Sequence, residues 1–490
     1  MPQVAICIFL FSLLASCSTP ASPTPVPTLT DIPASPTLPI PTVPLPTPTA
    51  TPVPVPPRAQ YTMNVVLDYA AKSAVVDETI VYPNHTGQAQ TSLVLAVEPN
   101  YWQGCFTLVN LTLDNAPANY TLDAHKLTIQ LPAVLAPEAI ATLHIQYTLK
   151  LPSIVPINQN SRPRIFGYSQ NQINLTNWYP FVVPFMNGQW VLHDAWFYGE
   201  NLVYDAADYT VNIESSDPAV KPVIATSGAP SQNGEWTTYT LTSGRTFAIS
   251  ASTVFKTISA QFGNVVVTSY YFPFYDQPAA STLKTAIEAL QIYSQRYGPY
   301  SHQTLAVVMG DFNDGMEFSA FFFLPHNAYD LYDGTNKNLL TTVTAHETAH
   351  QWFFEQVADD QAMQPWLDEA FAAYSEHIFY ESVDPSLISW WWAYWLPRVG
   401  GKDSLPWVDT NIYSAGGFIP YTNTIYLRGA HFLDDLRTRM GDAAFFAFLQ
   451  DYVKEENGKI ATTADFFRIL RKDTTVDFSD IVRQYFQNVY

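Results

Sequence analysis

Apolar and polar residues alternate with a period of two along much of the chain between residues 59 and 252. The alternation is clearest at Val109, Leu111, Leu113; Leu127, Ile129, Leu131; Leu143, Ile145, Tyr147, Leu149; Tyr209, Val211, Ile213; and Phe247, Ile249, Ala251. Such runs, separated by turn residues, predict strands that bury one face. We expect an antiparallel sandwich or saddle-shaped sheet as an N-terminal β domain over residues 59–255.

The pattern changes after residue 260. NVVVTSYYF (264–272) and TLAVVMGDF (304–312) predict strands on either side of a helix at about 278–297. The apolar run SAFFFL (319–324) is interpreted as a continuation of the strand that GMEF (315–318) begins. From residue 339 onward helices dominate, with later ones expected at about 385–396, 424–440, 442–456, 463–472 and 478–488. The prediction is a multidomain α+β protein whose second domain, 256–490, combines a small sheet with a helical lobe.

The first residues have the composition of a targeting segment. Residues 4–15, VAICIFLFSLLA, form an apolar stretch that is too short to span a bilayer. Leu14-Ala15-Ser16-Cys17 resembles a bacterial lipobox, although the preceding Met1-Pro2-Gln3 has no basic residue. We expect a signal peptide over 1–16 and lipidation of Cys17; the alternative is a conventional signal cleaved nearby.

A proline-rich segment follows. Residues 20–57 contain fifteen prolines and a single charged residue, Asp31. Such a composition favours the polyproline II conformation, in which the linker 17–58 would reach on the order of 100 Å. The expectation is an exported protein, lipid-anchored to the bacterial cell membrane, with its folded part outside the cytoplasm.

Charge and cysteine content add two exclusions. The formal net charge of −20 argues against nucleic acid as a partner. Cys7 would leave with the signal and Cys17 would be lipidated, so Cys105 has no intramolecular partner. Stability must then come from core burial rather than from disulfides.

The most specific chemistry lies in HETAH, residues 346–350. Residues four apart lie on one helix face, so His346 and His350 can direct two imidazoles at one metal ion. Glu347 lies between them, where its carboxylate can act as general base. After a gap of eighteen residues beyond His350, Glu369 offers a third ligand. Three protein ligands and one open position are typical of a catalytic zinc, so we expect one Zn²⁺ per chain.

The alternative is a surface helix with two partly solvated histidines. Apolar residues flank the motif, namely Leu339, Leu340, Val343, Phe353, Phe354 and Val357. A buried helix with two histidines and a glutamate would be unfavourable without a partner such as a metal. Pro365 precedes a second helical run, Trp366 to Glu381, and the segment 355–364 is long enough to reverse the chain. This context favours the zinc site.

At this point the sequence resembles a known family. HETAHQWF, WLDEAFAAYSE (366–376), DGMEF (314–318) and YLRGAHFL (426–433) are similar to motifs of the M1 zinc peptidases, the gluzincin aminopeptidases related to thermolysin. The similarity covers roughly 160–490. It implies a thermolysin-like catalytic domain behind an N-terminal β domain, in a short form that does not reach the helical superhelix of larger members. A more open cleft would then admit longer peptides.

The resemblance also implies roles for individual residues. His346, His350 and Glu369 would bind zinc, and Glu347 would activate water. In the GMEF strand Glu317 would hold the substrate's α-amino group, with Gly315 and Met316 beside it in the substrate-binding segment. Tyr426 would donate to the oxyanion, with Tyr413 and Tyr421 as competing candidates.

Two departures bear on specificity. Asp314 and Phe318 stand where the family's GAMEN segment has glycine and asparagine. The second amine-binding acid of many aminopeptidases has no counterpart, since NLTNWYPFVVP (174–184) contains no carboxylate.

The leading hypothesis is a surface zinc aminopeptidase acting on peptides. The alternatives are an endopeptidase or a hydrolase of another amide or an epoxide, and a non-catalytic binding protein that retains zinc. Glu347 argues against the last, because a structural site needs no base.

Overall fold

The computed structural model describes residues 58–154, 165–395, 405 and 407–490. Pro56–Tyr490 form one compact unit. The expected signal peptide, Cys17 and the proline-rich linker up to residue 57 lie outside the described residues.

None of the helices in the described ranges is long and apolar enough to cross a membrane.

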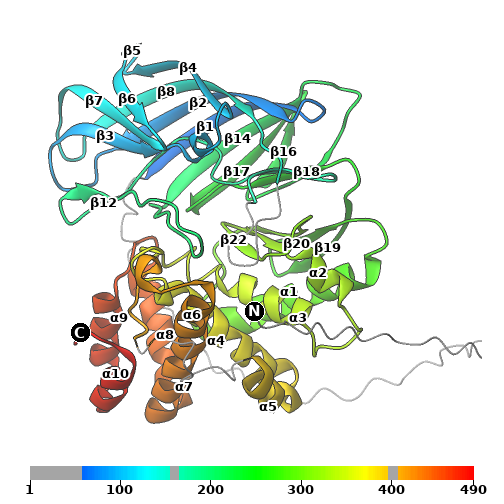
Figure 1. Ribbon diagram of the computed structural model, residues 1–490, viewed down its shortest axis with the longest axis vertical. Helices are drawn as coiled ribbons and strands as arrows, with labels where there is room; N and C mark the ends of the chain where they lie inside the picture. The colour runs from blue at the N-terminus through cyan, green and yellow to red at the C-terminus, as the bar shows by residue number, and fades with distance from the viewer. Residues whose placement is uncertain (1–57, 155–164, 396–404, 406) are drawn as a thin grey trace, which may run out of the picture. The chain divides into compact units, whose positions relative to one another are not determined.

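The part of the chain before residue 256 is built from β-sheets (Figure 1). Its largest sheet has the strand order β16-β17-β14-β1-β2-β8-β4-β5, and two four-stranded sheets have the orders β15-β18-β10-β9 and β11-β3-β7-β6. The strands are β1 (Ala59–Asp68), β2 (Ser73–Pro83), β3 (Gln90–Ala96), β4 (Phe106–Leu113), β5 (Ala116–Pro117), β6 (Asn119–Asp123), β7 (Lys126–Leu135), β8 (Ile140–Lys150), β9 (Gly167–Tyr168), β10 (Ile173–Leu175), β11 (Phe181–Val182), β12 (Phe185–Met186), β13 (Gln189–Trp190), β14 (Ala207–Ser215), β15 (Val223–Thr226), β16 (Ala229–Asn233), β17 (Trp236–Gly244) and β18 (Ile249–Ser252). The N-terminal β-sheet domain is therefore confirmed.

The antiparallel arrangement expected for this domain has one exception among the pairings of its named strands. β1 and β14 run parallel, with Ala59 opposite Ala207 and Leu67 opposite Ser215. Parallel neighbours need a long crossover, and the residues between these two strands supply it. Alternation within a strand reports its buried face and not the direction of its neighbour, so the sequence pattern did not reveal this pairing.

A separate five-stranded sheet begins with β19. Its strand order is β19-β20-β21-β23-β22, and helix α1 (Asp276–Tyr297) connects β20 to β21. The strands are β19 (Lys256–Phe262), β20 (Val265–Tyr271), β21 (Thr304–Met309), β22 (Met316–Phe318) and β23 (Phe321–Leu324). Sheet membership changes between β18 and β19, close to the expected domain boundary at 255, which stays a prediction.

The apolar run after GMEF does not continue the strand, which corrects the expectation. β22 and β23 form an antiparallel hairpin in which Phe318 faces Phe321, and Ala320 takes a positive φ of 53° at the turn. The Oγ of Ser319 fixes this reversal, because it accepts the backbone N–H groups of Arg245 and Thr246 at 2.7 and 2.9 Å. Because those partners are remote in sequence, the apolar residues around Ser319 give no local signal for the turn. β22 is left as an edge strand.

Helices make up most of the chain beyond residue 325 (Figure 1). They are α2 (His326–Asp330), α3 (Leu339–Ala349), α4 (Trp366–Val383), α5 (Ile388–Trp390), α6 (Phe418–Thr422), α7 (Gly429–Met440), α8 (Asp442–Glu456), α9 (Thr463–Asp473) and α10 (Ser479–Tyr485), with π-helical turns at Trp391–Trp395 and Asn423–Arg428. The expected helix at about 385–396 is present as one helical run that changes from 3₁₀ (Pro385–Leu387) through α5 to the π-helical turn Trp391–Trp395, and the last helix ends at Tyr485 rather than near 488. The mixed sheet followed by a helical lobe is confirmed.

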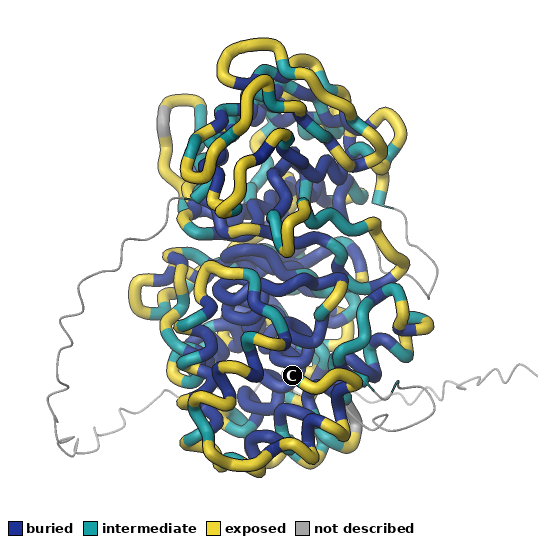
Figure 2. Tube along the Cα trace, turned by 90° about the vertical axis from the view of Figure 1, so that its left-hand side faces the viewer, coloured by how far each residue is buried: buried dark blue, intermediate teal, exposed yellow. Residues whose placement is uncertain are grey.

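The two helices that carry the candidate metal ligands lie in the core. Every residue of α4 from Trp366 to Tyr380 is buried, as expected for a helix that packs on all sides. Buried segments run through the interior of the sheet and helical parts alike (Figure 2). The candidate ligands are therefore held by packed elements and not by surface loops.

Candidate metal and active site

Helix α3 presents the two histidines from its last turn. Asn338 caps its N-terminus by accepting the Thr341 N–H at 2.9 Å, and the helix ends at Ala349 with His350 as its C-cap. His346 and His350 thus remain on one face, with ring centroids 4.9 Å apart. The chain then reverses through residues 351–365, as the sequence predicts, and α4 packs against α3.

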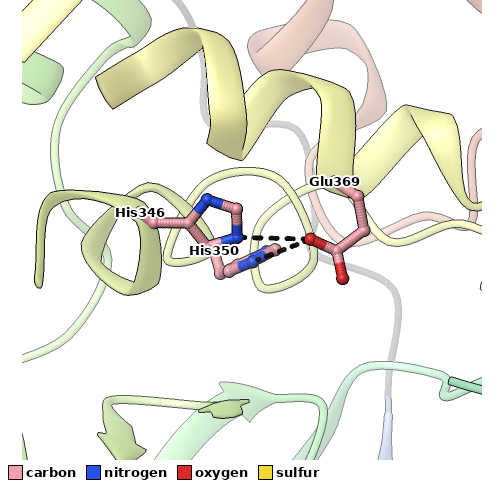
Figure 3. Close-up of side chains that lie close together, drawn as sticks. All are labelled: His346, His350 and Glu369. Atoms are coloured by element: carbon pink, nitrogen blue, oxygen red, sulfur yellow. Dashed lines mark hydrogen bonds and ion pairs between the residues drawn. The ribbon is translucent and has the colours of Figure 1, made fainter. Parts of the chain in front are cut away.

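Glu369 lies in the first turn of α4 and faces both imidazoles (Figure 3). Its Oε2 is 3.2 Å from Nε2 of His346 and 3.6 Å from Nε2 of His350. Burial acts to raise the pKa of Glu369, but the hydrogen bond from His346 and the charge of His350 outweigh it and lower the pKa to about 2. Glu369 is therefore held as a carboxylate.

The opposite nitrogens of the two rings are held by further carboxylates. Nδ1 of His346 donates to Glu376 at 2.8 Å, and Glu376 accepts the indole N–H of Trp391 at 2.9 Å. Nδ1 of His350 donates to Asp368 and lies 3.1 Å from the carbonyl of Phe353. These contacts fix both tautomers so that each Nε2 points at Glu369, the usual arrangement around a metal-binding histidine.

This donor set fits zinc. His346, His350 and Glu369 form a buried group whose ligand atoms all lie within 4.8 Å of one another. Zinc takes nitrogen at about 2.0–2.1 Å and carboxylate oxygen at about 2.0–2.2 Å, so tetrahedral ligands lie about 3.3–3.5 Å apart. The two nitrogen–oxygen separations of 3.2 and 3.6 Å match that spacing.

Glu347 lies beside this group and is 4% exposed. Burial raises its pKa to about 8, against the lowering effect of the charges on His346 and His350. Its Oε2 is buried and accepts no hydrogen bond from the described residues. A carboxylate that adjoins the metal ligands and has a vacant acceptor is suited to take a proton from water.

Gly315 adjoins Glu347 directly. A Cβ at Gly315 would lie 2.3 Å from Oε1 of Glu347 and 3.1 Å from the side chain of Val343. The glycine is thus required by the close approach of the strand to the Glu347 carboxylate, which gives this residue of the DGMEF segment a physical role.

Glu317 in β22 lies on the other side of the site. It is 2% exposed, and one of its carboxylate oxygens lies within 4.8 Å of ligand atoms of both His350 and Asp368. With Met316 it lines a cavity of about 650 Å³. Glu317 therefore lies both at a cavity and next to the candidate metal ligand His350, although the described lining of the cavity does not include the metal ligands themselves.

Tyr426 reaches the same place from the π-helical turn Asn423–Arg428. Its hydroxyl donates to Oε1 of Glu369, and its ring stacks on His346 with centroids 5.9 Å apart. Tyr413, a competing candidate, instead donates to the carbonyl of Asp194 at 2.7 Å. Tyr421 packs against the ring of Tyr426 with centroids 5.9 Å apart. Of the three candidates, Tyr426 is the one whose hydroxyl is seen to donate to a candidate metal ligand.

Some residues of the site were not identified from the sequence. Asp368 and Glu376 lie within the WLDEAFAAYSE segment, and their spacing from Glu369 was an available signal. Glu98 and Glu200 line the same cavity as Glu317, and both come from the N-terminal domain. The segment 174–184 contributes Thr176 and Asn177 to the lining and no carboxylate, as expected. No local pattern marked Glu98 or Glu200.

Comparisons with known proteins agree with this site. Residues 281–485 match the peptidase family M1 domain. Aminopeptidase N of Lactobacillus delbrueckii subsp. lactis is 26% identical over 221 residues, which cover 41% of this chain and 26% of that protein. Aminopeptidase M1 of Arabidopsis thaliana is 27% identical over 155 residues, covering 29% of this chain and 17% of that protein. The matched region thus spans about a quarter or less of these relatives.

Solved structures resemble the chain over a greater length. The M1 zinc metallopeptidase of Deinococcus radiodurans superposes with a TM-score of 0.64 at 20% identity, covering 88% of this chain and 95% of that one. A mutant two-domain M1 zinc metallopeptidase bound to L-arginine gives a TM-score of 0.62 at 18% identity, covering 85% and 91%. The domain match and the fold agree: residues 281–485 form a peptidase family M1 domain, and the chain has the fold of two-domain M1 zinc metallopeptidases.

Proposed function

We propose that the protein is a zinc-dependent aminopeptidase that removes N-terminal residues from peptides. The observation that carries this proposal is the position of Glu317, whose carboxylate lies within 4.8 Å of the candidate zinc ligand His350. In a peptide the α-amino nitrogen is separated from the first carbonyl carbon by about 2.5 Å. A carboxylate this close to the metal ligands suits a substrate whose free amine precedes the scissile bond by one residue.

The residues of the chain divide the chemistry among them. Zinc, when held by His346, His350 and Glu369, supplies Lewis acidity and lowers the pKa of water to about 7. Glu347 accepts the proton of the attacking water and delivers it to the leaving amine. The phenol of Tyr426 donates to the negative charge that develops on the scissile carbonyl oxygen, and a donor of this kind contributes about 3 kcal/mol.

Edge strand β22 can align the substrate. Its partner β23 covers one side, and the opposite backbone edge has no neighbouring strand in the sheet. An extended peptide that pairs with Met316–Phe318 would direct its N-terminus at Glu317 and its first carbonyl at the metal ligands.

Related proteins support the substrate class. The matching relatives in Lactobacillus and Arabidopsis are named aminopeptidases. A mutant of the Deinococcus radiodurans enzyme is described as bound to a Tyr-Ser-Ala substrate.

A free N-terminus is the feature to test. The zinc-loaded protein should hydrolyse a tripeptide with a free amine and leave its N-acetylated form largely intact. Glu317→Gln should lower kcat/KM for the free peptide by about 10²-fold, because the ammonium loses its charge-assisted partner. Glu235→Gln, at an exposed hairpin turn, serves as the matched control and should leave activity unchanged. Equal hydrolysis of the free and acetylated peptides would contradict the proposal.

We further propose that the enzyme acts outside the cytoplasm as a lipid-anchored protein. Support comes from the apolar stretch 4–15, the lipobox-like Leu14–Cys17 and the proline-rich linker after it. Metabolic labelling with a fatty acid in a bacterial host tests this. Label and membrane association should both be lost in Cys17→Ala. A wild-type protein that takes up no label would contradict lipidation and leave conventional signal cleavage as the alternative.

A further inference from the structure

We propose that Gln361 is a positioning residue that holds the amine-binding carboxylate of Glu317 and the carboxylate of Asp368, which orients the zinc ligand His350, in one fixed arrangement. It belongs to the turn between α3 and α4, outside the metal-binding motif. Its amide Nε2 donates to Oε1 of Glu317 at 3.1 Å and to Oδ2 of Asp368 at 2.9 Å. The inference rests on the proposed function, because it gives Glu317 the role of amine anchor.

The chemistry of the contact fixes the orientation of the amide. Both partners are carboxylates, which accept hydrogen bonds when ionised, and only the NH₂ end of a glutamine side chain donates. The two amide hydrogens are thus shared, one to each carboxylate. With Gln361 turned over, its carbonyl oxygen would face two like-charged acceptors inside a buried site, which is strongly unfavourable.

Two parts of the site are joined through this single side chain. Asp368 accepts from Nδ1 of His350, whose Nε2 faces Glu369, so the chain of contacts leads from Gln361 to the metal ligands. The other contact leads to Glu317, which lines the cavity together with Gln361 itself. Glu317, His350 and Asp368 also have ligand atoms within 4.8 Å of one another. The NH₂ group of Gln361 thus places its donor hydrogens between the two carboxylates and favours their approach.

The backbone around Gln361 is held from several directions. The preceding residue, Asp360, lies 3.0 Å from Nε2 of His193 in the N-terminal domain, and its carbonyl accepts the N–H of Gln364 at 2.7 Å. The following residue, Ala362, accepts the N–H of Ile412 through its carbonyl at 3.0 Å. Gln361 is 4% exposed. Because the backbone of this turn is fixed, the side chain of Gln361 is preorganised and can hold the carboxylates of Glu317 and Asp368 in place.

The alternative is that Gln361 only fills space in a buried turn. Three variants separate the two roles. Gln361→Met keeps the length and volume but cannot donate. Gln361→Asn keeps a polar amide but is one methylene too short to reach both carboxylates, and it serves if the methionine variant folds poorly. Gln364→Met is the matched control, because Gln364 lies in the same turn yet bonds Thr463 at 2.7 Å and not the site.

The first measurement is steady-state hydrolysis of a free-amine tripeptide by zinc-loaded protein. Loss of a hydrogen bond to a charged group predicts that KM rises about tenfold in Gln361→Met, with a smaller change in kcat. In a Glu317→Gln background the same substitution should change KM little, because its effect passes through Glu317. If Gln361 only packs, Gln361→Met should change KM by the same factor with or without Glu317→Gln. Gln364→Met should then have an effect on KM similar to that of Gln361→Met.

The second measurement is the zinc dissociation constant, determined by competition with a chelator. Freeing Asp368 should weaken zinc binding about tenfold or more in Gln361→Met and not in Gln364→Met. If the wild type hydrolyses free and N-acetylated peptides equally well, the proposed function fails. The zinc dissociation constants still show whether Gln361 orients Asp368 and, through it, His350. A Gln361→Met protein that keeps both the wild-type KM and the wild-type zinc affinity would overturn the inference.

Discussion

Gly315 leaves the space that the carboxylate of Glu347 occupies, since a Cβ at Gly315 would lie 2.3 Å from Oε1 of Glu347. The glycine belongs to the DGMEF segment before β22 and the glutamate to α3, so the sheet and the metal-bearing helix meet at this contact. The position of Glu347, the proposed general base, therefore depends on the absence of a side chain at Gly315.

Gly315→Ala tests this relationship. The added methyl group must displace Glu347, and a shift of about 1 Å in a catalytic group costs about 10²-fold in rate. We expect kcat to fall by about that factor while zinc content stays at the wild-type level, as measured by steady-state kinetics and metal analysis. Gly263→Ala, at a turn with a φ of 57° where a Cβ would meet nothing within 4 Å, is the control for a destabilised glycine site remote from the chemistry and should leave kcat unchanged. Wild-type kcat in Gly315→Ala would contradict the argument.

Tyr426→Phe tests the oxyanion donor. Removing the hydroxyl should lower kcat by about 10²–10³-fold, because the donor acts mainly in the transition state. The tyrosine hydroxyl also contacts Glu369, so zinc content must be measured alongside. The corresponding control is Tyr413→Phe, whose hydroxyl contacts the carbonyl of Asp194. If Tyr426→Phe changes KM and leaves kcat at the wild-type value, the hydroxyl binds substrate instead.

Zinc binding should release protons. Burial acts to lower the pKa of His346, but hydrogen bonds to Glu369 and Glu376 outweigh it and raise the pKa to about 10. The metal-free ring of His346 is therefore the imidazolium cation, protonated on both nitrogens, at neutral pH. Zinc binds only the neutral imidazole, so one proton must leave when the metal binds. We expect at least about one proton per zinc at pH 7, and an affinity that falls as the pH is lowered.

Calorimetry in two buffers of different ionisation enthalpy measures this release. The apparent heat of zinc binding should differ between the buffers in proportion to their ionisation enthalpies. Equal heats would show that His346 is already neutral in the metal-free protein.

Arg245 offers a test of stability away from the chemistry. Its side chain is 1% exposed and donates to backbone carbonyls of Glu355, Gln356 and Lys459 at 2.8–3.1 Å. Arg245→Met would leave buried carbonyls without donors, at a cost of about 1–3 kcal/mol in the free energy of unfolding for each carbonyl that stays unsatisfied. Urea titration measures the change. Arg58→Met, which breaks a partly exposed pair with Asp208, should cost about 1 kcal/mol or less. Similar losses in both variants would contradict the special role of Arg245.

The ability of the sequence to predict this site depended on distance along the chain. Two consecutive helices, α3 and α4, and the turn between them carry His346, Glu347, His350 and Glu369. Their spacing alone therefore predicts that they converge. Glu98 and Glu200 reach the cavity through tertiary folding, and nothing in their neighbours marks them. Gln361 lay inside the turn that the sequence identified as a reversal, but its two contacts depend on rotamers and on β22.

The fold shows the same limit. Alternating residues predicted the strands of the N-terminal domain, whose buried faces are local properties. The parallel pairing of β1 with β14 and the hairpin turn at Ala320 depend on contacts with remote segments. In the fully apolar run 321–324 no alternation was available to signal the reversal.

Metal analysis combined with peptide hydrolysis tests the central claim most directly. The protein from residue 58 to 490, in wild-type and Glu347→Gln forms, would be assayed for zinc per chain. The same two proteins would be assayed for release of an N-terminal residue from a free-amine tripeptide. We predict one zinc per chain in both forms and a loss of about 10²–10⁴-fold in kcat for Glu347→Gln, since the general base is removed while the ligands remain. Zinc-loaded wild type that hydrolyses no peptide, or a Glu347→Gln form with wild-type kcat, would contradict it.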